Sequence, residues 1–349
     1  MLRRRSLFLV PSILPGLVRA NWIASPDRAF RGWPTLIRRK SGELIAVYSG
    51  GREGHVCPFG RVELIRSLDD GQSWSHPQIV WDTPIDDRDA GILETPKGTL
   101  LLTTFTSLVY EKQPKYQGFP QAVPPEKRQA LLDSWMLRST DNGLTWSAPY
   151  RVPVNSPHGP IALSSGQLAY PGKVLYGSKG EIGVSFSGDD GLTWKRFSPI
   201  PTRPGDDANE YHELHGVEAK PGHLIVHIRN HNKTNERETL QTESADGGKT
   251  WSVPHAIGVW GLPSHLLRLR DGRLVMTYSY RRNPRGNHAR VSKDLGKTWS
   301  EPIVLSDDGS GDLGYPSTVE LANGELLSLW YEVPKAGEPA GLRTKRFRL

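Results

Sequence analysis

An eight-residue string that ends in tryptophan occurs five times along this 349-residue chain. The copies share the pattern S-x-D-x-G-x-[ST]-W and occupy residues 67–74, 139–146, 187–194, 244–251 and 292–299. In each copy the Asp side chain can accept hydrogen bonds from backbone amides just downstream, and the Gly can adopt a positive φ angle. We expect a tight turn between two strands, with the Trp folded back as an apolar plug against its own sheet. The acids of this motif are therefore predicted to be structural.

A second repeated unit alternates with the first along the chain. It consists of an apolar strand, a turn, the motif Gly-x-Leu and another apolar strand, which is typical of a β-hairpin. Its Gly-x-Leu pairs are Gly42/Leu44, Gly98/Leu100, Gly166/Leu168, Gly222/Leu224, Gly272/Leu274 and Gly324/Leu326. Six hairpins interleaved with five Trp-ended turns make six four-stranded units, which can bury both faces of each sheet when they surround an axis. The sequence therefore predicts an all-β chain: one six-bladed β-propeller over residues 21–349, with the N-terminal strand closing the ring against the last blade.

The spacing of the hairpins breaks once. Successive Gly-x-Leu motifs are 68 residues apart in the second unit and 50–56 residues apart elsewhere. The surplus is an insertion at about 107–135, in which a short helix is expected to begin near Pro125. This insertion is either a lid over the axis that carries Tyr110, Tyr116 and Phe119, or a loop at the edge of the ring.

The first twenty residues have a basic start, an apolar run and a small-residue end at Ala20. This is the layout of a bacterial-type signal peptide, so we expect an exported protein, periplasmic or secreted, and no membrane span. Without the four arginines of this segment the net charge falls from +7 to +3, which argues against a nucleic-acid partner. Cys57 is the single cysteine, so no intramolecular disulfide can form and no disulfide-linked partner is required.

Five such turns, each ending a blade, resemble the Asp boxes of the sialidase (neuraminidase) superfamily, and the resemblance covers nearly the whole chain after residue 20. The boxes lie on the outer rim, so function must come from the opposite ends of the hairpins. The resemblance implies an exo-glycosidase that removes terminal sialic acid or a related 2-keto acid sugar from an acidic glycan. In such enzymes three arginines bind the substrate carboxylate, and a tyrosine paired with a Glu attacks the sugar with retention through a tyrosyl intermediate.

The segment DLGYPSTVELANGELLSLWYE at 312–332 is similar to the family's Tyr-Ser-x-Leu segment before the final hairpin. The resemblance places the catalytic nucleophile at Tyr315. Pro316 stands where the family usually has serine. Packing of Tyr315 beside this proline is the structural alternative.

The segment YHELHGVEAKPGHLIVHIRN at 211–230 resembles the family's arrangement of a Glu, a hairpin and an Arg. It implies that Glu213 is the base for the tyrosine and that Arg229 belongs to the arginine triad. Glu218 is the second candidate for the base. A structural salt bridge between Glu213 and Arg229 is the alternative to a catalytic role.

The other two triad arginines are less clearly placed by the resemblance. In the family the first triad arginine stands in the sequence Arg-Ile-Pro, two residues before the proline. Here Arg31 lies three residues before Pro34. Arg52 is the alternative, as a substitute for Arg31 or as an added ligand. For the third, the loop at 279–294 offers four candidates. Two of them, Arg285 and Arg282, suit the position better than Arg281 and Arg290.

The acid/base position departs most from the family, because the loop after the first hairpin contains no Asp. Glu53 and His55 are the titratable groups there, and either could protonate a leaving oxygen. Elsewhere the hairpin register places a charged run and a histidine at the axial end of the blades. They either form a wall of the site that contacts sugar hydroxyls or pair with one another as a structural cluster. These residues are Arg88, Asp87, Asp89 and His158.

Two alternatives to a sialidase-like enzyme remain open. The same fold could act on another acidic sugar, Kdo-like, Kdn-like or a uronate, or it could be a non-catalytic propeller that binds glycan or protein. No cofactor is expected. No metal site is predicted either, because the histidines at 212, 215, 223, 227 and 231 lie on a strand–turn–strand, where four-residue spacing does not converge side chains on an ion. We expect them to line a polar funnel.

Overall fold

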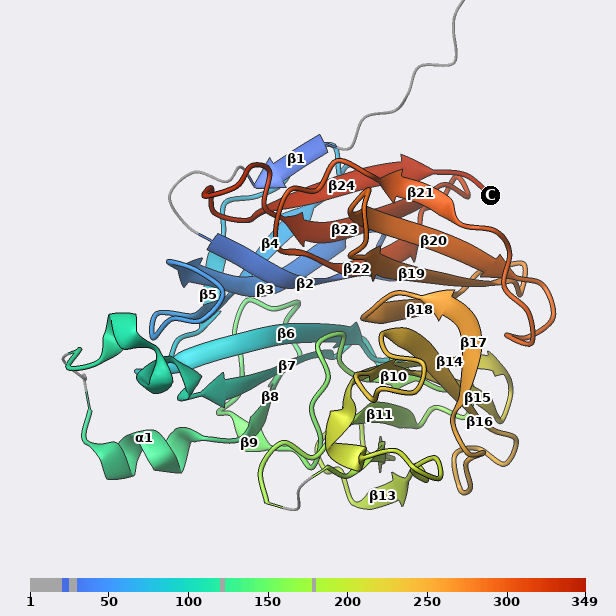
Figure 1. The fold of residues 1–349 in the computed structure, drawn as a ribbon, viewed down its shortest axis with the longest axis horizontal. Coiled ribbons are helices and arrows are strands. Elements are labelled where there is room, and N and C mark those ends of the chain that lie inside the picture. Colours follow the sequence, from blue (N-terminus) through green and yellow to red (C-terminus); the bar gives the residue numbers. More distant parts are fainter. Residues whose placement is uncertain (1–20, 25–29, 120–122, 178–179) are drawn as a thin grey trace, which may run out of the picture.

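The computed structural model describes residues 21–24, 30–119, 123–177 and 180–349. Within these residues the strands form six four-stranded antiparallel sheets arranged as the blades of a propeller (Figure 1). The predicted six-bladed fold is confirmed. Blades 1 to 3 comprise β2 Phe30–Arg38, β3 Leu44–Arg52, β4 Arg61–Ser67 and β5 Gln78–Trp81; β6 Asp86–Glu94, β7 Leu100–Ser107, β8 Ser134–Ser139 and β9 Tyr150–Arg151; β10 Ile161–Ala162, β11 Leu168–Lys173, β12 Ile182–Ser187 and β13 Arg196–Pro199.

Blades 4 to 6 complete the ring. Their strands are β14 Tyr211–Lys220, β15 His223–Asn230, β16 Glu238–Ser244 and β17 His255–Trp260; β18 Ser264–Arg268, β19 Leu274–Tyr280, β20 Gly286–Ser292 and β21 Ile303–Ser306; β22 Leu313–Glu320, β23 Leu326–Glu332, β24 Gly341–Phe347 and β1 Asn21–Ala24. The N-terminal strand pairs with β24, with Asn21 opposite Thr344, so it closes the ring as predicted. Residues 1–20, the expected signal peptide, lie outside the described residues. Among the described helices none has the length and apolarity needed to cross a membrane.

The repeated turns have the expected hydrogen bonds. In the fourth copy the Asp246 carboxylate accepts from the backbone amides of Lys249 and Thr250 at 2.9 and 3.0 Å and from the Thr250 hydroxyl at 2.7 Å. The backbone amide of Gly248, at φ 80°, donates to Ser244 Oγ at 2.8 Å. The side chains of these turns are therefore used within the turn itself.

The tryptophans of the turns join neighbouring blades, which corrects the expectation that each packs on its own sheet. Trp146, from blade 2, packs against a cluster that contains Ile45 and Val47 of blade 1 and Leu100 and Leu102 of blade 2. The other four pack in the same way between their own blade and the one before it: Trp74, Trp194, Trp251 and Trp299. Each turn thus stabilises an interface between two blades.

The insertion in blade 2 contains η1 Val109–Lys112, η2 Pro114–Tyr116 and α1 Pro125–Leu131, so the helix predicted near Pro125 is confirmed. The insertion projects from one side of the ring (Figure 1). Tyr110 and Tyr116 are 0% and 6% exposed and form a small core with Cys57 of the blade 1 loop. The ring of Phe119 contacts Phe59 of that loop, with centroids 5.4 Å apart. These aromatic side chains therefore pack on blade 1 and do not form a lid over the axis.

Candidate functional site

On three of the innermost strands, a β-bulge directs one side chain toward the axis. β2, β6 and β22 each carry a β-bulge, and at each bulge one residue has a left-handed backbone: Trp33 at φ 54°, Asp89 at φ 45° and Tyr315 at φ 53°. Such conformations are unfavourable for residues other than Gly and concentrate where a side chain must be re-aimed. The three bulges therefore mark the functional end of the propeller.

Tyr315, Glu213 and Arg229 form the centre of the site. The Tyr315 hydroxyl donates to Glu213 Oε1 at 2.5 Å. Arg229 Nη1 donates to the same carboxylate oxygen at 2.9 Å and to the Tyr315 hydroxyl at 3.0 Å. Blades 4 and 6 thus bring a phenol, a carboxylate and a guanidinium into mutual contact, as the spacing of the segments at 211–230 and 312–332 predicts.

The charges of this cluster fix the resting protonation states of Tyr315 and Glu213. Burial raises the pKa of Tyr315 well above its usual value, the charge of Glu213 raises it further, and Arg229 lowers it. Burial alone would raise the pKa of Glu213, but the charge of Arg229 and the hydrogen bond from Tyr315 lower it to about 2. Near neutral pH the resting site therefore holds a neutral phenol beside an ionised carboxylate that can accept its proton.

A second layer supports Tyr315. Its ring lies 5.9 Å, centroid to centroid, from the buried ring of Tyr331. The Tyr331 hydroxyl donates to Asp312 Oδ1 at 2.8 Å, and the other oxygen of Asp312 lies 2.6 Å from His55 Nδ1. Trp33 packs beside Tyr331, at 5.8 Å between ring centroids. Tyr331 therefore connects the ring of Tyr315 with Trp33 and with the Asp312–His55 pair.

Asp89 is a buried acid that lines a small cavity together with Glu213. It is 6% exposed, and its Oδ1 has no hydrogen-bond partner among the described residues. Burial raises the pKa of Asp89 to about 6, although Arg88 lowers it. The cavity measures about 190 Å³ and is lined by Asp89, Phe105, Asn155, Ser156, Pro157, Lys173, Leu175, His212 and Glu213. It is smaller than the roughly 300–1,000 Å³ of typical ligand pockets.

Arg52 is not available to a substrate. Its guanidinium is fully buried and forms a bidentate pair with Asp86 at 2.5 and 3.1 Å. It also donates to Ser49 Oγ at 2.9 Å and to three backbone carbonyls. Arg52 and Arg88 both lie against the Trp33 ring, at 4.8 and 4.6 Å from its centroid. The expectation that Arg52 replaces the first triad arginine is therefore wrong, because Asp86 neutralises it inside the fold.

The other arginine predictions need corrections as well. Burial raises the pKa of the Tyr48 hydroxyl, whereas the charge of Arg31 and its hydrogen bond lower it, so the guanidinium of Arg31 lies near Tyr48. Arg282 and Arg285 are exposed: the first stacks on the Trp260 ring at 4.0 Å, and the second donates to the Gly311 carbonyl at 3.3 Å.

Arg281, the less favoured candidate of the same loop, is half-buried beside the site. Its Nη2 donates to the Leu313 carbonyl at 2.9 Å and lies 3.9 Å from Asp312. Arg281 immediately follows the last residue of β19, and this position at a strand end could have identified it from the sequence.

Four further predicted residues do not line the cavity of Asp89 and Glu213. Both oxygens of Asp87 accept hydrogen bonds from Trp81 and Thr83, so Asp87 is structural. His158 packs against His215 and His265 at the axis and lines a different cavity, of about 620 Å³. Glu218 accepts from Ser164 and Gly222 at the hairpin turn. Glu53 pairs at 2.7 Å with Lys115 of the insertion, so the blade 1 loop and blade 2 hold it away from the cavity.

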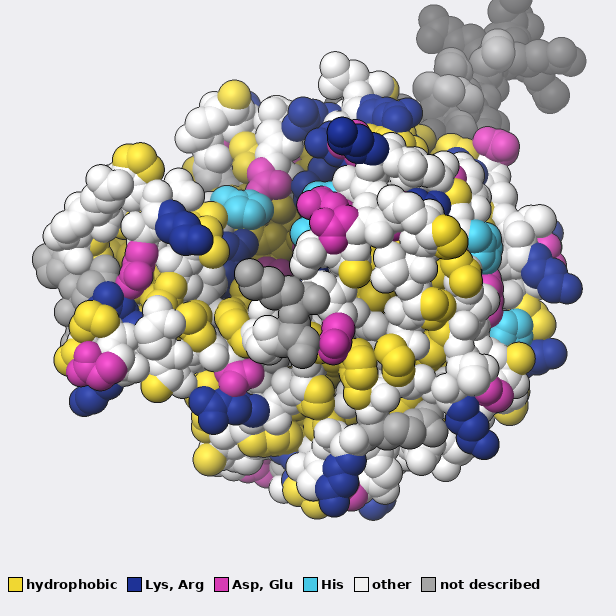
Figure 2. Space-filling model, turned by 60° about the horizontal axis from the view of Figure 1, so that its bottom comes forward, with side chains coloured by type: hydrophobic (Ala, Val, Ile, Leu, Met, Phe, Trp, Pro, Cys, Tyr) yellow, Lys and Arg dark blue, Asp and Glu magenta, His cyan; other side chains and the backbone are white. Residues whose placement is uncertain are grey.

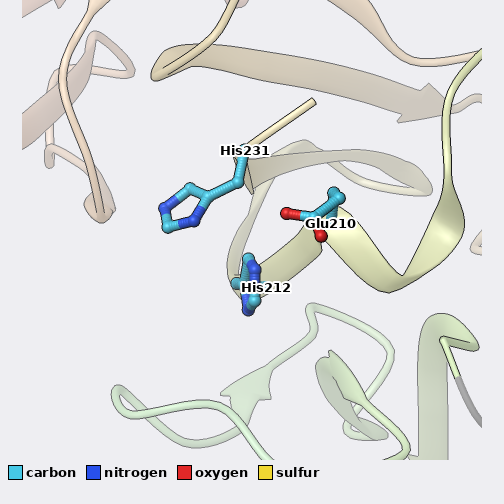
Figure 3. A group of neighbouring side chains, drawn as sticks. All are labelled: Glu210, His212 and His231. Atoms are coloured by element: carbon cyan, nitrogen blue, oxygen red, sulfur yellow. The ribbon is translucent and has the colours of Figure 1, made fainter. Parts of the chain in front are cut away.

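Histidine, acidic and basic side chains gather around a hollow beside the insertion on the face shown in Figure 2. Among the described residues one group has the chemistry and spacing of metal ligands: Glu210, His212 and His231 (Figure 3). His231 also contacts the central cluster, because its Nε2 accepts from Arg229 Nε at 2.9 Å.

The comparisons with known proteins concern the fold and the family of the chain. The chain is 25% identical over 338 residues to a sialidase of Bacteroides fragilis, covering 86% of this chain and 59% of the sialidase, so it spans about three fifths of that relative. A structure of unknown function from Dyadobacter fermentans matches with a TM-score of 0.78 and 23% identity over 94% of this chain and 97% of the other. The Hadza microbial sialidase Hz136 matches with a TM-score of 0.72 and 17% identity, over 95% and 68% of the two chains.

These structural likenesses establish the fold, a sialidase-like six-bladed propeller. The sequence relationship extends to the repeats themselves: the family model for the BNR repeat-like domain matches residues 42–327, most of the chain. The chain therefore belongs to the BNR repeat-like domain family.

Proposed function

We propose that this protein is a retaining exo-glycosidase that removes a terminal acidic sugar, sialic acid or a related 2-keto acid sugar, through a tyrosyl intermediate. The observation that carries the proposal is the three-way contact of Tyr315, Glu213 and Arg229 at 2.5–3.0 Å. A structural ion pair between Glu213 and Arg229 would not need a phenol held in a left-handed backbone conformation against both.

The proposed reaction has two displacement steps. Tyr315 Oη attacks the anomeric carbon while Glu213 accepts the phenolic proton, and Asp89 donates a proton to the departing glycosidic oxygen. Water then attacks the same carbon, with Asp89 accepting a proton from the water and Glu213 returning its proton to the Tyr315 oxygen. A phenol serves better than a carboxylate nucleophile here, because an acidic substrate would repel a second negative charge.

The cavity is suited to a negatively charged sugar. Arg229 contacts Glu213 and Tyr315, Lys173 lines the cavity, and Arg281 donates to the carbonyl of Leu313, two residues before Tyr315. Guanidinium groups bind carboxylates through paired N–H donors. The loop after the first hairpin contains no Asp, and this departure from the sialidase pattern favours a second candidate substrate class: another acidic sugar, Kdo-like, Kdn-like or a uronate.

A panel of 4-methylumbelliferyl glycosides tests the proposal and separates the substrate classes. Release of the fluorophore from sialosides or other acidic glycosides, with none from neutral glycosides of glucose or galactose, is the expected result. No turnover of any acidic glycoside would leave the non-catalytic glycan- or protein-binding propeller as the better account. We further propose that the protein is exported after cleavage at Ala20, which the N-terminal sequence of the secreted protein would test.

Replacing Asp89 by Asn should reduce kcat/KM about 10²-fold, because the general acid is lost. The loss should be larger for a glycan with an alcohol leaving group than for methylumbelliferone, which departs without much protonation. In the wild type, kcat/KM should fall above about pH 6, since Asp89 must be protonated in the first step. The charged or titratable groups that face Asp89 are Arg88, Glu213, His55, Arg52, Tyr170, Tyr315 and Tyr331.

The same variant should be more stable than the wild type at pH 7. The pKa of Asp89 rises from 3.8 to about 6 on folding, so the folded state binds this proton more tightly than the unfolded state. The free energy of unfolding therefore falls as pH rises from 4 to 6, by up to about 3 kcal/mol. Urea unfolding at pH 4 and pH 7 measures this free energy. A variant with the same free energy of unfolding as the wild type at both pH values would contradict the buried-acid account.

His55→Gln, which changes the other candidate acid, is the matched control for the activity of the Asp89 variant.

Replacing Arg281 by Ala should raise KM for an acidic glycoside about 10-fold, because one guanidinium that attracts the substrate charge is lost. Arg282→Ala and Arg285→Ala, from the same loop, should leave KM within about twofold. Both side chains are exposed, one stacked on Trp260 and the other bonded to the Gly311 carbonyl, whereas Arg281 is half-buried beside Asp312 and Tyr331. Steady-state kinetics of the three variants measure this. A larger KM effect at Arg285 than at Arg281 would reverse the assignment.

A further inference from the structure

We infer that Glu210, His212 and His231 form a binding site for a divalent transition metal of the zinc type, beside the Tyr315 cluster. One ligand atom from each of the three side chains lies within 4.8 Å of the other two. Figure 3 shows the side chains around one space, from the end of η3 Ala208–Glu210, the start of β14 and the residue after β15.

The register of the hairpin explains why these side chains meet. Tyr211 of β14 pairs with Asn230 of β15, and the His231 amide donates to the Glu210 carbonyl at 2.9 Å. Glu210 and His231 are therefore opposite one another across the two strands. His212 lies two residues after Glu210 and so shares its face. The sequence-based expectation that these histidines do not converge is wrong, because it considered spacing along the strand and not this cross-strand pairing.

The donor set fits zinc. Two imidazoles and a carboxylate are the ligands of many zinc sites that keep one coordination position open. Bound ligand atoms lie roughly 3.3 Å apart when each is about 2.1 Å from the metal, so the side chains must close by about 1.5 Å. Glu210 is exposed and both histidines are half-buried, which leaves them room to rotate. Glu210 and His231 also line a cavity of about 460 Å³, from which an ion can enter.

The surroundings of the site set its affinity and connect it to the catalytic cluster. Arg229 Nε donates to His231 Nε2 at 2.9 Å, and this hydrogen bond must break when His231 binds a metal. Arg229 keeps its contacts with Glu213 and Tyr315. Lys173, bonded to the carbonyls of Asn209 and Tyr211, adds a second nearby positive charge. Repulsion from these two cations makes us expect moderate affinity for zinc and none for calcium or magnesium, which prefer all-oxygen sites.

Calorimetric titration of the untagged, EDTA-treated full chain with ZnCl₂ tests the inference. We expect close to one equivalent to bind, and both Glu210→Gln and His212→Ala to weaken binding at least about tenfold. Co²⁺ should give visible absorption bands of a four- or five-coordinate site, and Zn²⁺ should raise the Tm of the wild type. These measurements need no substrate, so they succeed or fail independently of the proposed glycosidase activity.

His255→Ala is the matched control, because His255 lies 3.7 Å from Glu243 on the outer strands, and within the described part of the chain no third ligand residue joins this pair. It should bind zinc as the wild type does. Circular dichroism melts of the metal-free variants check that they are folded. Failure of the wild type to bind zinc, or unchanged binding by folded Glu210→Gln and His212→Ala variants, would overturn the site.

Discussion

Tyr315→Phe should lower kcat on an acidic glycoside by roughly 10³-fold or more, because it removes the oxygen that forms the covalent bond to the sugar. The fold should survive the change. The hydroxyl bonds to Glu213 and Arg229, which also bond to one another, and the Phe ring can keep its place beside Tyr331. Steady-state kinetics with a methylumbelliferyl glycoside, together with a thermal melt, measure both effects.

Tyr280→Phe is a suitable control for this variant. Tyr280 ends β19 of blade 5, and its ring stacks on His288 at 4.6 Å between centroids. It should retain wild-type kcat. A folded Tyr315→Phe protein with more than about a tenth of wild-type kcat would exclude the phenol as the nucleophile, whatever the substrate.

Arg229→Met should reduce both stability and activity. Methionine fills much of the same volume but leaves Glu213 in a largely buried position without its counter-charge, which costs about 3 kcal/mol. Activity should fall by at least about 10²-fold, because the guanidinium also donates to the Tyr315 hydroxyl and attracts the acidic substrate. Urea unfolding gives the first quantity and kcat/KM the second.

Arg138→Met separates the two effects of the Arg229 variant. Arg138 pairs with Asp190 at 3.1 Å and has a similar exposure, but it lies on β8 away from the cavity. It should lose stability while keeping kcat/KM. If both variants lost activity in proportion to stability, Arg229 would have a structural role only.

The sequence predicted the fold because the signals for it are local. Each Asp box contains its own hydrogen-bond donors and acceptors within eight residues, as the turn at Asp246 illustrates. The Trp-ended turns and Gly-x-Leu hairpins therefore fix the strand order without knowledge of distant contacts. The partner of each tryptophan was missed because it lies on the neighbouring blade, which the local motif does not specify.

The difference between local signals and contacts distant in the sequence applies to the candidate site as well. Tyr315, Glu213 and Arg229 could be expected to meet because hairpin ends from different blades lie at one end of the axis. Arg52 and Arg31 could not be placed, because their orientation depends on the bulge at Trp33 and on the buried partner Asp86. A bulge changes the direction of a side chain without leaving a clear pattern in the sequence.

The acid at Asp89 and the cluster at Glu210 were missed for related reasons. The raised pKa of Asp89 comes from burial in a cavity lined by residues of blades 2, 3 and 4, and burial of one carboxyl among several in a charged run is not visible in composition. The convergence of Glu210 with His231 depends on strand register, which a one-residue slip would abolish.

Mass spectrometry of a trapped intermediate tests the central claim most directly. An acidic glycosyl fluoride with a second fluorine next to the anomeric carbon forms a covalent glycosyl-enzyme that breaks down slowly. After incubation with such a reagent and proteolysis, we predict that the peptide containing Tyr315 gains the mass of one sugar on that tyrosine, and that Glu213→Gln accumulates the adduct more slowly. A protein that turns over an acidic glycoside yet carries the sugar on another residue, or on none, would contradict the account.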